Sequence, residues 1–170
     1  WHGPWLRERT LRLPTWRAWL VIILVGGSSL LWTSLQLHAW LSVHDPVEDA
    51  EYVVIEGWVP DTVVWRAVQW AKEHKTKRIY TTGVPIDRSM FTNTEIHYSD
   101  ICALSAKRMG ADPALLRPAP APEVRRERTR AMAMGLKNAL DADAIPAEAR
   151  KVNVFTLGAH AWRSRYHIQR

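Results

Sequence analysis

We base the expected fold of this chain on the segment Glu51-Tyr-Val-Val-Ile-Glu-Gly-Trp-Val-Pro-Asp61. Its first six residues form a short, β-branched apolar run, which is typical of a strand buried on both faces. Pro60 and Asp61 then open a helical pattern that continues to His74, with Asp61 as the expected N-cap. A strand followed directly by a helix is the repeating unit of a parallel sheet.

The same alternation recurs three more times along the chain. Further strands are expected over 77–82, over a short run from Leu115 that the prolines from Pro118 onward cut off, and over 152–157. Helices are expected over 94–109, closed by Gly110, over 126–140, and from His160 onward. Four strand–helix units predict an α/β fold, a Rossmann-like three-layer parallel sheet covered by helices on both faces.

An uncharged segment precedes this domain. Residues 18–43 contain no Asp, Glu, Lys or Arg, and as a helix they would span about 39 Å, enough for a hydrocarbon core of about 30 Å. A cleavable signal peptide would have a shorter apolar region of about 7–15 residues. The sequence therefore predicts an uncleaved transmembrane anchor.

Charged residues on the two sides of the anchor indicate its orientation. Four arginines precede the anchor and four carboxylates follow it: Arg7, Arg9, Arg12, Arg17; Asp45, Glu48, Asp49, Glu51. The positive-inside bias then predicts a cytoplasmic basic flank (1–17), a transmembrane anchor (18–43) and an extracytoplasmic α/β domain (45–170). We expect a single-pass protein of the inner (plasma) membrane, with the lipid bilayer as its first partner.

The ends of the chain suggest a fragment. It starts at Trp1 without Met and stops at Arg170, shortly after the start of the last expected helix. We therefore expect the domain to be incomplete at its C-terminus. Cys102 is the only cysteine, which excludes a disulfide framework and a cysteine-based metal cluster.

Candidate site residues follow from the parallel sheet, because ligands of such folds bind outside the carboxyl ends of the strands. Two of the four turns after the strands are rich in arginine, and helix N-termini add backbone N–H donors at the same edge. An anion such as a phosphate fits this setting. Glu56 and His160 are the candidate general acids or bases, and the candidate ligand-binding residues are Gly57, Trp58, Thr82, Gly83, Arg128, Thr129, Arg163 and Arg165.

Simpler interpretations exist for several of these residues. Arginines near position 126 are typical of a solvated helix face, and Trp58 could be a packing residue. The sequence has no GxGxxG, GxxxxGK[ST], GxSxG or HExxH motif, so dinucleotide, P-loop, hydrolase-elbow and zinc-protease interpretations lack support. No metal or cofactor is expected. Nucleic acid is not an expected partner despite the net charge of +6, because four of the arginines lie before the anchor.

Four pieces of the sequence carry a family resemblance: Val53-Val-Ile-Glu-Gly-Trp58, Tyr80-Thr-Thr-Gly83, Arg126-Glu-Arg-Thr129, and Val152-Asn-Val-Phe-Thr-Leu-Gly-Ala-His160 followed by Arg163-Ser-Arg165. On these pieces the chain resembles the YdcF/SanA/ElyC-like family, long catalogued as a domain of unknown function, from about Glu51 to the chain end. The resemblance implies a Rossmann-like three-layer fold. For anchored members it also implies a role in the bacterial envelope, in peptidoglycan or lipid-carrier metabolism and barrier function. One soluble member is associated with S-adenosylmethionine binding.

Three functional hypotheses remain open at this point. The first is an anchored envelope protein that binds or processes an anionic, phosphorylated or lipid-linked substrate, with Arg128, Arg163 and Arg165 holding the anion. The second is a non-enzymatic module that assembles envelope-biogenesis proteins. The third, suggested by analogy of fold, is a nucleotide-binding or S-adenosylmethionine-binding domain.

Overall fold

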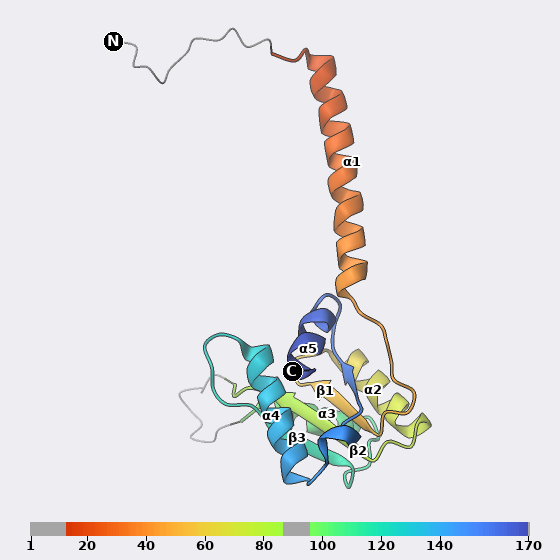
Figure 1. Cartoon of the computed structure of the whole chain (residues 1–170), viewed down its shortest axis with the longest axis vertical. Helices are drawn as coiled ribbons and strands as arrows, with labels where there is room; N and C mark the ends of the chain where they lie inside the picture. Colours follow the sequence, from red (N-terminus) through yellow and green to blue (C-terminus); the bar gives the residue numbers. More distant parts are fainter. Residues whose placement is uncertain (1–12, 87–95, 170) are drawn as a thin grey trace, which may run out of the picture. The chain divides into compact units, whose positions relative to one another are not determined.

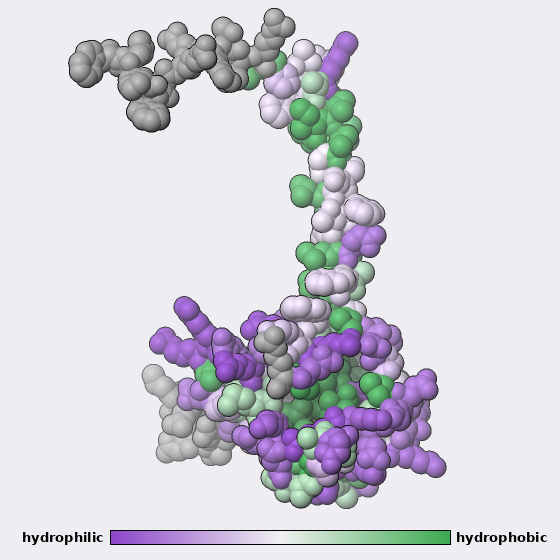
Figure 2. Space-filling view, viewed as in Figure 1, coloured by the Kyte–Doolittle hydropathy of each residue, from purple (hydrophilic) through white to green (hydrophobic). Residues whose placement is uncertain are grey.

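The structure is a computed structural model that describes residues 13–86 and 96–169. It divides into two compact units, Trp1–Leu37 and His38–Arg170. The first unit holds most of helix α1 (Trp16–Leu41), which is long and apolar enough to cross a membrane. Figure 2 shows apolar side chains exposed along this helix, and none of its residues is buried. The expected apolar helix is therefore present, whereas most of the basic flank, 1–12, lies outside the described residues.

The second unit is built on a four-stranded parallel sheet (Figure 1). Its strands lie in the order β3-β2-β1-β4: β3 (Leu116–Pro120), β2 (Arg78–Gly83), β1 (Tyr52–Glu56) and β4 (Val152–Phe155). All five residues of β1 are buried, as its β-branched run predicted. The α/β class and the all-parallel sheet are thus confirmed.

Helices cover both faces of the sheet (Figure 1). Because side chains alternate along a strand, Val53 and Ile55 of β1 face one core while Val54 faces another. The first core contains residues of α2 (Asp61–Glu73) and α3 (Tyr98–Arg108). The second contains residues of α4 (Arg128–Ala142) and α5 (His160–Ile168). A short 3-10 helix, Ala147–Ala149, which the sequence did not predict, precedes β4.

Strand β3 differs from its prediction, because it continues through Pro118 to Pro120 instead of ending before the prolines. Ala121 N–H donates to the Gly83 carbonyl, and the Leu115 carbonyl accepts from Ile79 N–H, both at 2.9 Å. Odd-numbered residues of β3 therefore bond to β2, and the two prolines occupy positions whose N–H would point away from the sheet. Proline is tolerated at such outward positions of an edge strand.

Two helix starts also differ from their predictions. The N-cap of α2 is Pro60, and Asp61 is its first helical residue, where its carboxylate faces the positive end of the helix. Helix α3 begins at Tyr98 among the described residues, and the expected start at 94–95 lies outside them. The predicted end of α3 is confirmed, because Gly110 adopts a left-handed φ of 88° and Ala111 N–H bonds to the Ala106 carbonyl at 3.0 Å.

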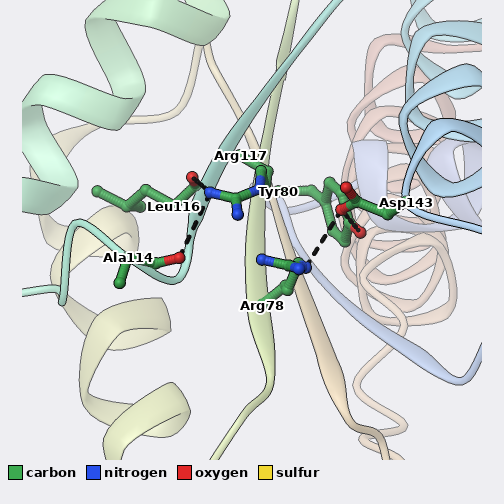
Figure 3. Close-up of polar contacts among 6 residues, drawn as sticks. All are labelled: Arg78, Tyr80, Ala114, Leu116, Arg117 and Asp143. Atoms are coloured by element: carbon green, nitrogen blue, oxygen red, sulfur yellow. Dashed lines mark hydrogen bonds and ion pairs between the residues drawn. The ribbon is translucent and has the colours of Figure 1, made fainter.

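A polar network ties the sheet to the C-terminal end of α4 (Figure 3). The buried Tyr80 hydroxyl donates to Asp143 Oδ2 at 2.6 Å, and Arg78 Nε lies 3.3 Å from the same oxygen. Burial and the bond to Asp143 both raise the pKa of Tyr80 above its usual range. On the outer edge, the Arg117 guanidinium donates to the Leu116 carbonyl at 3.0 Å.

We expect Tyr80→Phe to lower the free energy of unfolding by about 1.5–3 kcal/mol, because it removes a buried hydrogen bond to a charged acceptor. Arg78 still pairs with Asp143 in this variant. Since the folded-state pKa of Tyr80 is raised, its contribution is complete below pH of about 10 and is lost as the pH rises through the folded-state value. Urea titrations of the full chain in detergent micelles at neutral and alkaline pH would measure both effects. Tyr98→Phe, at a half-exposed tyrosine, is the control, and an unchanged alkaline slope in Tyr80→Phe would contradict the prediction.

Candidate functional site

A cleft of about 400 Å³ opens where the turn after β1 and the end of β2 meet the first turns of α3, α4 and α5. We call it the α4–α5 cleft. It is lined by Trp58, Gly83, Val84, Tyr98, Arg125, Arg126, Glu127, Arg128, Thr129, Met132, His160 and Arg163. Its position agrees with the expectation that a parallel α/β sheet presents a binding crevice at the carboxyl ends of its strands.

Six of the ten candidate site residues meet in this cleft: Trp58, Gly83, Arg128, Thr129, His160 and Arg163. They come from separate turns of the chain and converge because all four strands point the same way. Glu56, Gly57, Thr82 and Arg165 do not line it. The sequence missed Tyr98, because the helix that carries it was expected to begin four residues earlier.

The cleft carries a positive charge. Four arginines line it, Arg125, Arg126, Arg128 and Arg163, against the single carboxylate of Glu127. All four are exposed, and none of them forms an ion pair within 4 Å with another residue in the described ranges. Glu127 itself pairs with Arg130, at 3.3 Å. Arg125 and Arg126, for which a solvated helix face was the simpler interpretation, therefore add to the positive electrostatic potential inside the cleft.

Helix α4 begins with an unusual backbone conformation at its N-cap. Glu127 is its N-cap and adopts a left-handed φ of 57°, a conformation that is uncommon outside glycine. Among the described residues no side chain caps this helix, Thr129 included. Thr129 is instead a buried residue in the first turn. The uncapped first-turn N–H groups add their partial positive charge to that of the arginines.

Trp58 and His160 form an aromatic wall of the cleft. Their ring centroids are 4.8 Å apart, with the planes tilted by 57°. Trp58 Nε1 donates a hydrogen bond of 3.0 Å to Glu56 Oε2, which fixes the orientation of the indole. The imidazole of His160 is therefore held against a ring that is itself tied to the end of β1.

Glu56 lies behind this wall and is only 3% exposed. Besides Trp58, its carboxylate accepts hydrogen bonds from Ser164 Oγ, at 2.6 Å, and from Thr156 Oγ1. These donors come from the turn after β1, the end of β4 and the buried side of α5. Glu56 thus joins three segments of the domain, and its contact with the cleft passes through Trp58.

Gly57 and Gly83 allow the first turn of α3 to approach the strand ends. A Cβ atom at Gly57 would lie 2.7 Å from the Tyr98 carbonyl oxygen, and one at Gly83 would lie 2.4 Å from Ser99 N. Gly57 N–H also donates to the Thr82 carbonyl at 2.6 Å. At both glycines the protein's own helix α3 therefore makes a close backbone approach beneath the cleft.

Arg165 faces a different part of the domain. Its guanidinium lies 3.1 Å from Asp45 Oδ2, and both residues line a second cleft of about 520 Å³ between residues 42–47, β4 and α5. Two positions along a helix correspond to a rotation of about 200°, so Arg163 and Arg165 cannot share one face. Arg165 is not available to an anion in the α4–α5 cleft.

Within residues 13–86 and 96–169 no group of three or more His, Cys, Asp or Glu side chains is placed to hold a metal ion. Comparison with known proteins found no matching family model, curated protein or solved structure.

Proposed function

We propose that this protein is a membrane-anchored component of the bacterial cell envelope whose α/β domain binds or processes an anionic, phosphorylated or lipid-linked ligand in the α4–α5 cleft. The resemblance to the YdcF/SanA/ElyC-like family supports a place in peptidoglycan biogenesis or barrier function. The strand order β3-β2-β1-β4, with helices on both faces, supports a Rossmann-like three-layer fold. Basic residues before the apolar helix and acidic residues after it support an extracytoplasmic domain in the inner membrane.

One observation carries the proposal: Arg128 and Arg163 line the same cleft beside the uncapped N-terminus of α4. Both arginines are exposed and make no ion pair with any other described residue. No ion pair with a described residue therefore gives either arginine a role in stabilising the fold. A guanidinium group binds a phosphate or carboxylate through two parallel N–H donors. Backbone N–H groups of a helix N-terminus bind the same ligands.

His160 is the residue that we assign to proton transfer, because it lines the cleft and Trp58 holds its ring in place. Glu56 acts in this proposal as a positioning residue, since its carboxylate accepts three hydrogen bonds within the domain and contacts the cleft through Trp58. His160→Ala would then reduce turnover more than binding.

A nucleotide or S-adenosylmethionine is a second candidate ligand, because Trp58 and Tyr98 offer two aromatic rings beside the arginines. Such a ligand needs both the charge and the rings, whereas inorganic phosphate or pyrophosphate needs the charge alone. An envelope-assembly module without a ligand would bind none of these compounds. A single set of binding measurements therefore separates the three functions.

We expect inorganic pyrophosphate to stabilise the full chain in detergent micelles, by about 2.7 kcal/mol at 100 times its dissociation constant. Arg128→Ala or Arg163→Ala should each weaken binding by about 1.5–3 kcal/mol, because each removes a charge-assisted contact. Thermal-shift titration of the wild type and the variants would measure both quantities, with S-adenosylmethionine and a nucleoside diphosphate as parallel ligands.

Arg108→Ala is the matched control, because Arg108 is an exposed helical arginine outside both clefts. It should leave binding unchanged, and none of the three substitutions should alter the melting of the free protein by much. Equal losses in all three variants would show a nonspecific charge effect. The absence of stabilisation by any of the compounds would favour the assembly module.

A further inference from the structure

Helix α5 has two faces with different chemistry. Ser164 is 1% exposed and points into the domain toward Glu56. Trp162 and Tyr166 lie two positions before and after it, about 160° away around the helix axis, and are 41% and 39% exposed. Large aromatic side chains spaced four residues apart therefore form an outward stripe on this helix.

This stripe continues onto the end of α1. The Trp162 ring stacks on Tyr166, with centroids 5.8 Å apart and planes tilted by 15°. The Trp162 ring also lies 5.8 Å from the ring of Trp40. Both rings belong to the compact unit that begins at His38, so their separation is internal to that unit. We call Trp40, Trp162 and Tyr166 the aromatic face.

The position of Trp40 in α1 indicates the depth of the aromatic face in the bilayer. It is the penultimate residue of α1, which at 26 residues extends over about 39 Å and exceeds a hydrocarbon core of about 30 Å. The ends of such a helix lie in the headgroup region, where indole and phenol rings are favoured because they have an apolar body and a polar edge. Trp162, within 5.8 Å of Trp40, must lie at a similar depth.

We propose that the aromatic face of α5 is a membrane-docking surface that seats the domain in the headgroup region of the bilayer. Arg163 lies beside the stripe, where a guanidinium can reach lipid phosphate groups. Because His160 and Arg163 also line the α4–α5 cleft, docking holds the cleft within about one helix diameter, 10–12 Å, of the lipid surface. This inference rests on the proposed membrane anchor but not on the identity of the ligand.

The test uses the full chain in phosphatidylcholine nanodiscs with a nitroxide label at one introduced cysteine. Trp162→Cys and Tyr166→Cys report on the aromatic face, Trp65→Cys on α2 is the exposed-tryptophan control, and Leu30→Cys reports on the anchor. Native Cys102 is buried, and burial raises the pKa of its thiol to about 12, so it should not react. Accessibility to oxygen, which concentrates in lipid, is compared with accessibility to a water-soluble nickel chelate.

We expect the ratio of oxygen to nickel accessibility to be several-fold higher at positions 162 and 166 than at 65, and highest at 30. Equal ratios at 162 and 65, with 30 in lipid, would overturn the docking surface and leave the anchor intact. Shielding of 162 from both reagents would show that a second copy of the chain covers the face. Nickel accessibility at 30 would refute the anchor itself, and with it the docking inference.

A second measurement needs no introduced cysteine. In nanodiscs that contain brominated phosphatidylcholine, Trp162→Phe should remove part of the lipid-dependent quenching of tryptophan fluorescence. Trp65→Phe should remove none, because Trp65 lies on α2, which packs on the opposite face of the sheet from α5. Equal quenching in wild type and Trp162→Phe would contradict docking.

Discussion

Glu56→Ala should lower the free energy of unfolding by roughly 3 kcal/mol or more, because three donors lose the acceptor that they share. Trp58 Nε1, Thr156 Oγ1 and Ser164 Oγ all bond to this carboxylate, and each buried donor left unsatisfied costs about 1–3 kcal/mol. The cost should be largest for Ser164, because its side chain is almost fully buried and water cannot replace the lost acceptor. A loss of this size is a large fraction of the roughly 5–15 kcal/mol that stabilises a typical domain.

Urea unfolding of the full chain in detergent micelles, followed by circular dichroism, would measure this loss. Glu73→Ala, at an exposed position of α2, is the matched control and should stay within about 0.5 kcal/mol of the wild type. Glu56→Gln should cost less than Glu56→Ala, because its amide oxygen still accepts and the hydroxyl groups can rotate to accept from its amide nitrogen. If Glu56→Ala were as stable as Glu73→Ala, the carboxylate would not join these segments.

The same variants test the positioning role of Glu56. Glu56→Gln keeps the shape of the side chain, so Trp58 should remain against His160 and anion binding should persist. Glu56→Ala frees the indole, so the cleft should lose its aromatic wall. A loss of pyrophosphate binding in Glu56→Ala that exceeds that in Glu56→Gln, measured at temperatures where both are folded, is the outcome expected of a positioning residue.

Gly83→Ala should destabilise the domain by about 3 kcal/mol, at the upper end of the range for overpacked sites. The added Cβ would meet Ser99 N at 2.4 Å and Tyr98 Cβ at 2.6 Å. These atoms belong to the first turn of α3, so no change of rotamer can move them away. Relief requires α3 to shift as a unit, which would disturb the core that it forms with α2.

Gly27→Ala is the control for this substitution, because a Cβ at Gly27 would meet nothing within 4 Å. It should leave unfolding of the α/β domain unchanged when both variants are compared in the same detergent. A Gly83→Ala variant with wild-type stability would mean that α3 can move away from the strand ends. Since Gly83 and Tyr98 both line the α4–α5 cleft, such a movement would also widen the cleft.

Local patterns in the sequence determined the elements of this protein. The β-branched run from Tyr52 to Glu56 was sufficient to predict a buried strand, because burial on both faces requires consecutive apolar residues. An uncharged stretch near the N-terminus was sufficient to predict one long apolar helix. The convergence of Arg128, His160 and Arg163 was also predictable, since parallel strands place all their following turns at one edge of the sheet.

One prediction from the sequence was wrong because the position of a strand in the sheet overrides a local rule. Prolines were expected to end β3, yet the strand continues because it lies at the sheet edge with its proline nitrogens facing outward.

Arg165 was grouped with Arg163 because the two are close in sequence, although helical geometry separates them by about 200°. That separation was available from the sequence as soon as a helix was assigned there.

Other features of the site depended on the tertiary structure alone. No local pattern links Glu56 to Thr156 and Ser164, which are 100 and 108 positions away. The contact of Gly83 with the start of α3 likewise depends on how closely a helix packs on the strand ends. Sequence patterns report which face of an element is apolar, and thereby determined the strands, helices and shared edge of this protein. The partners of its buried carboxylate and of its glycines were decided only when packing brought distant segments together.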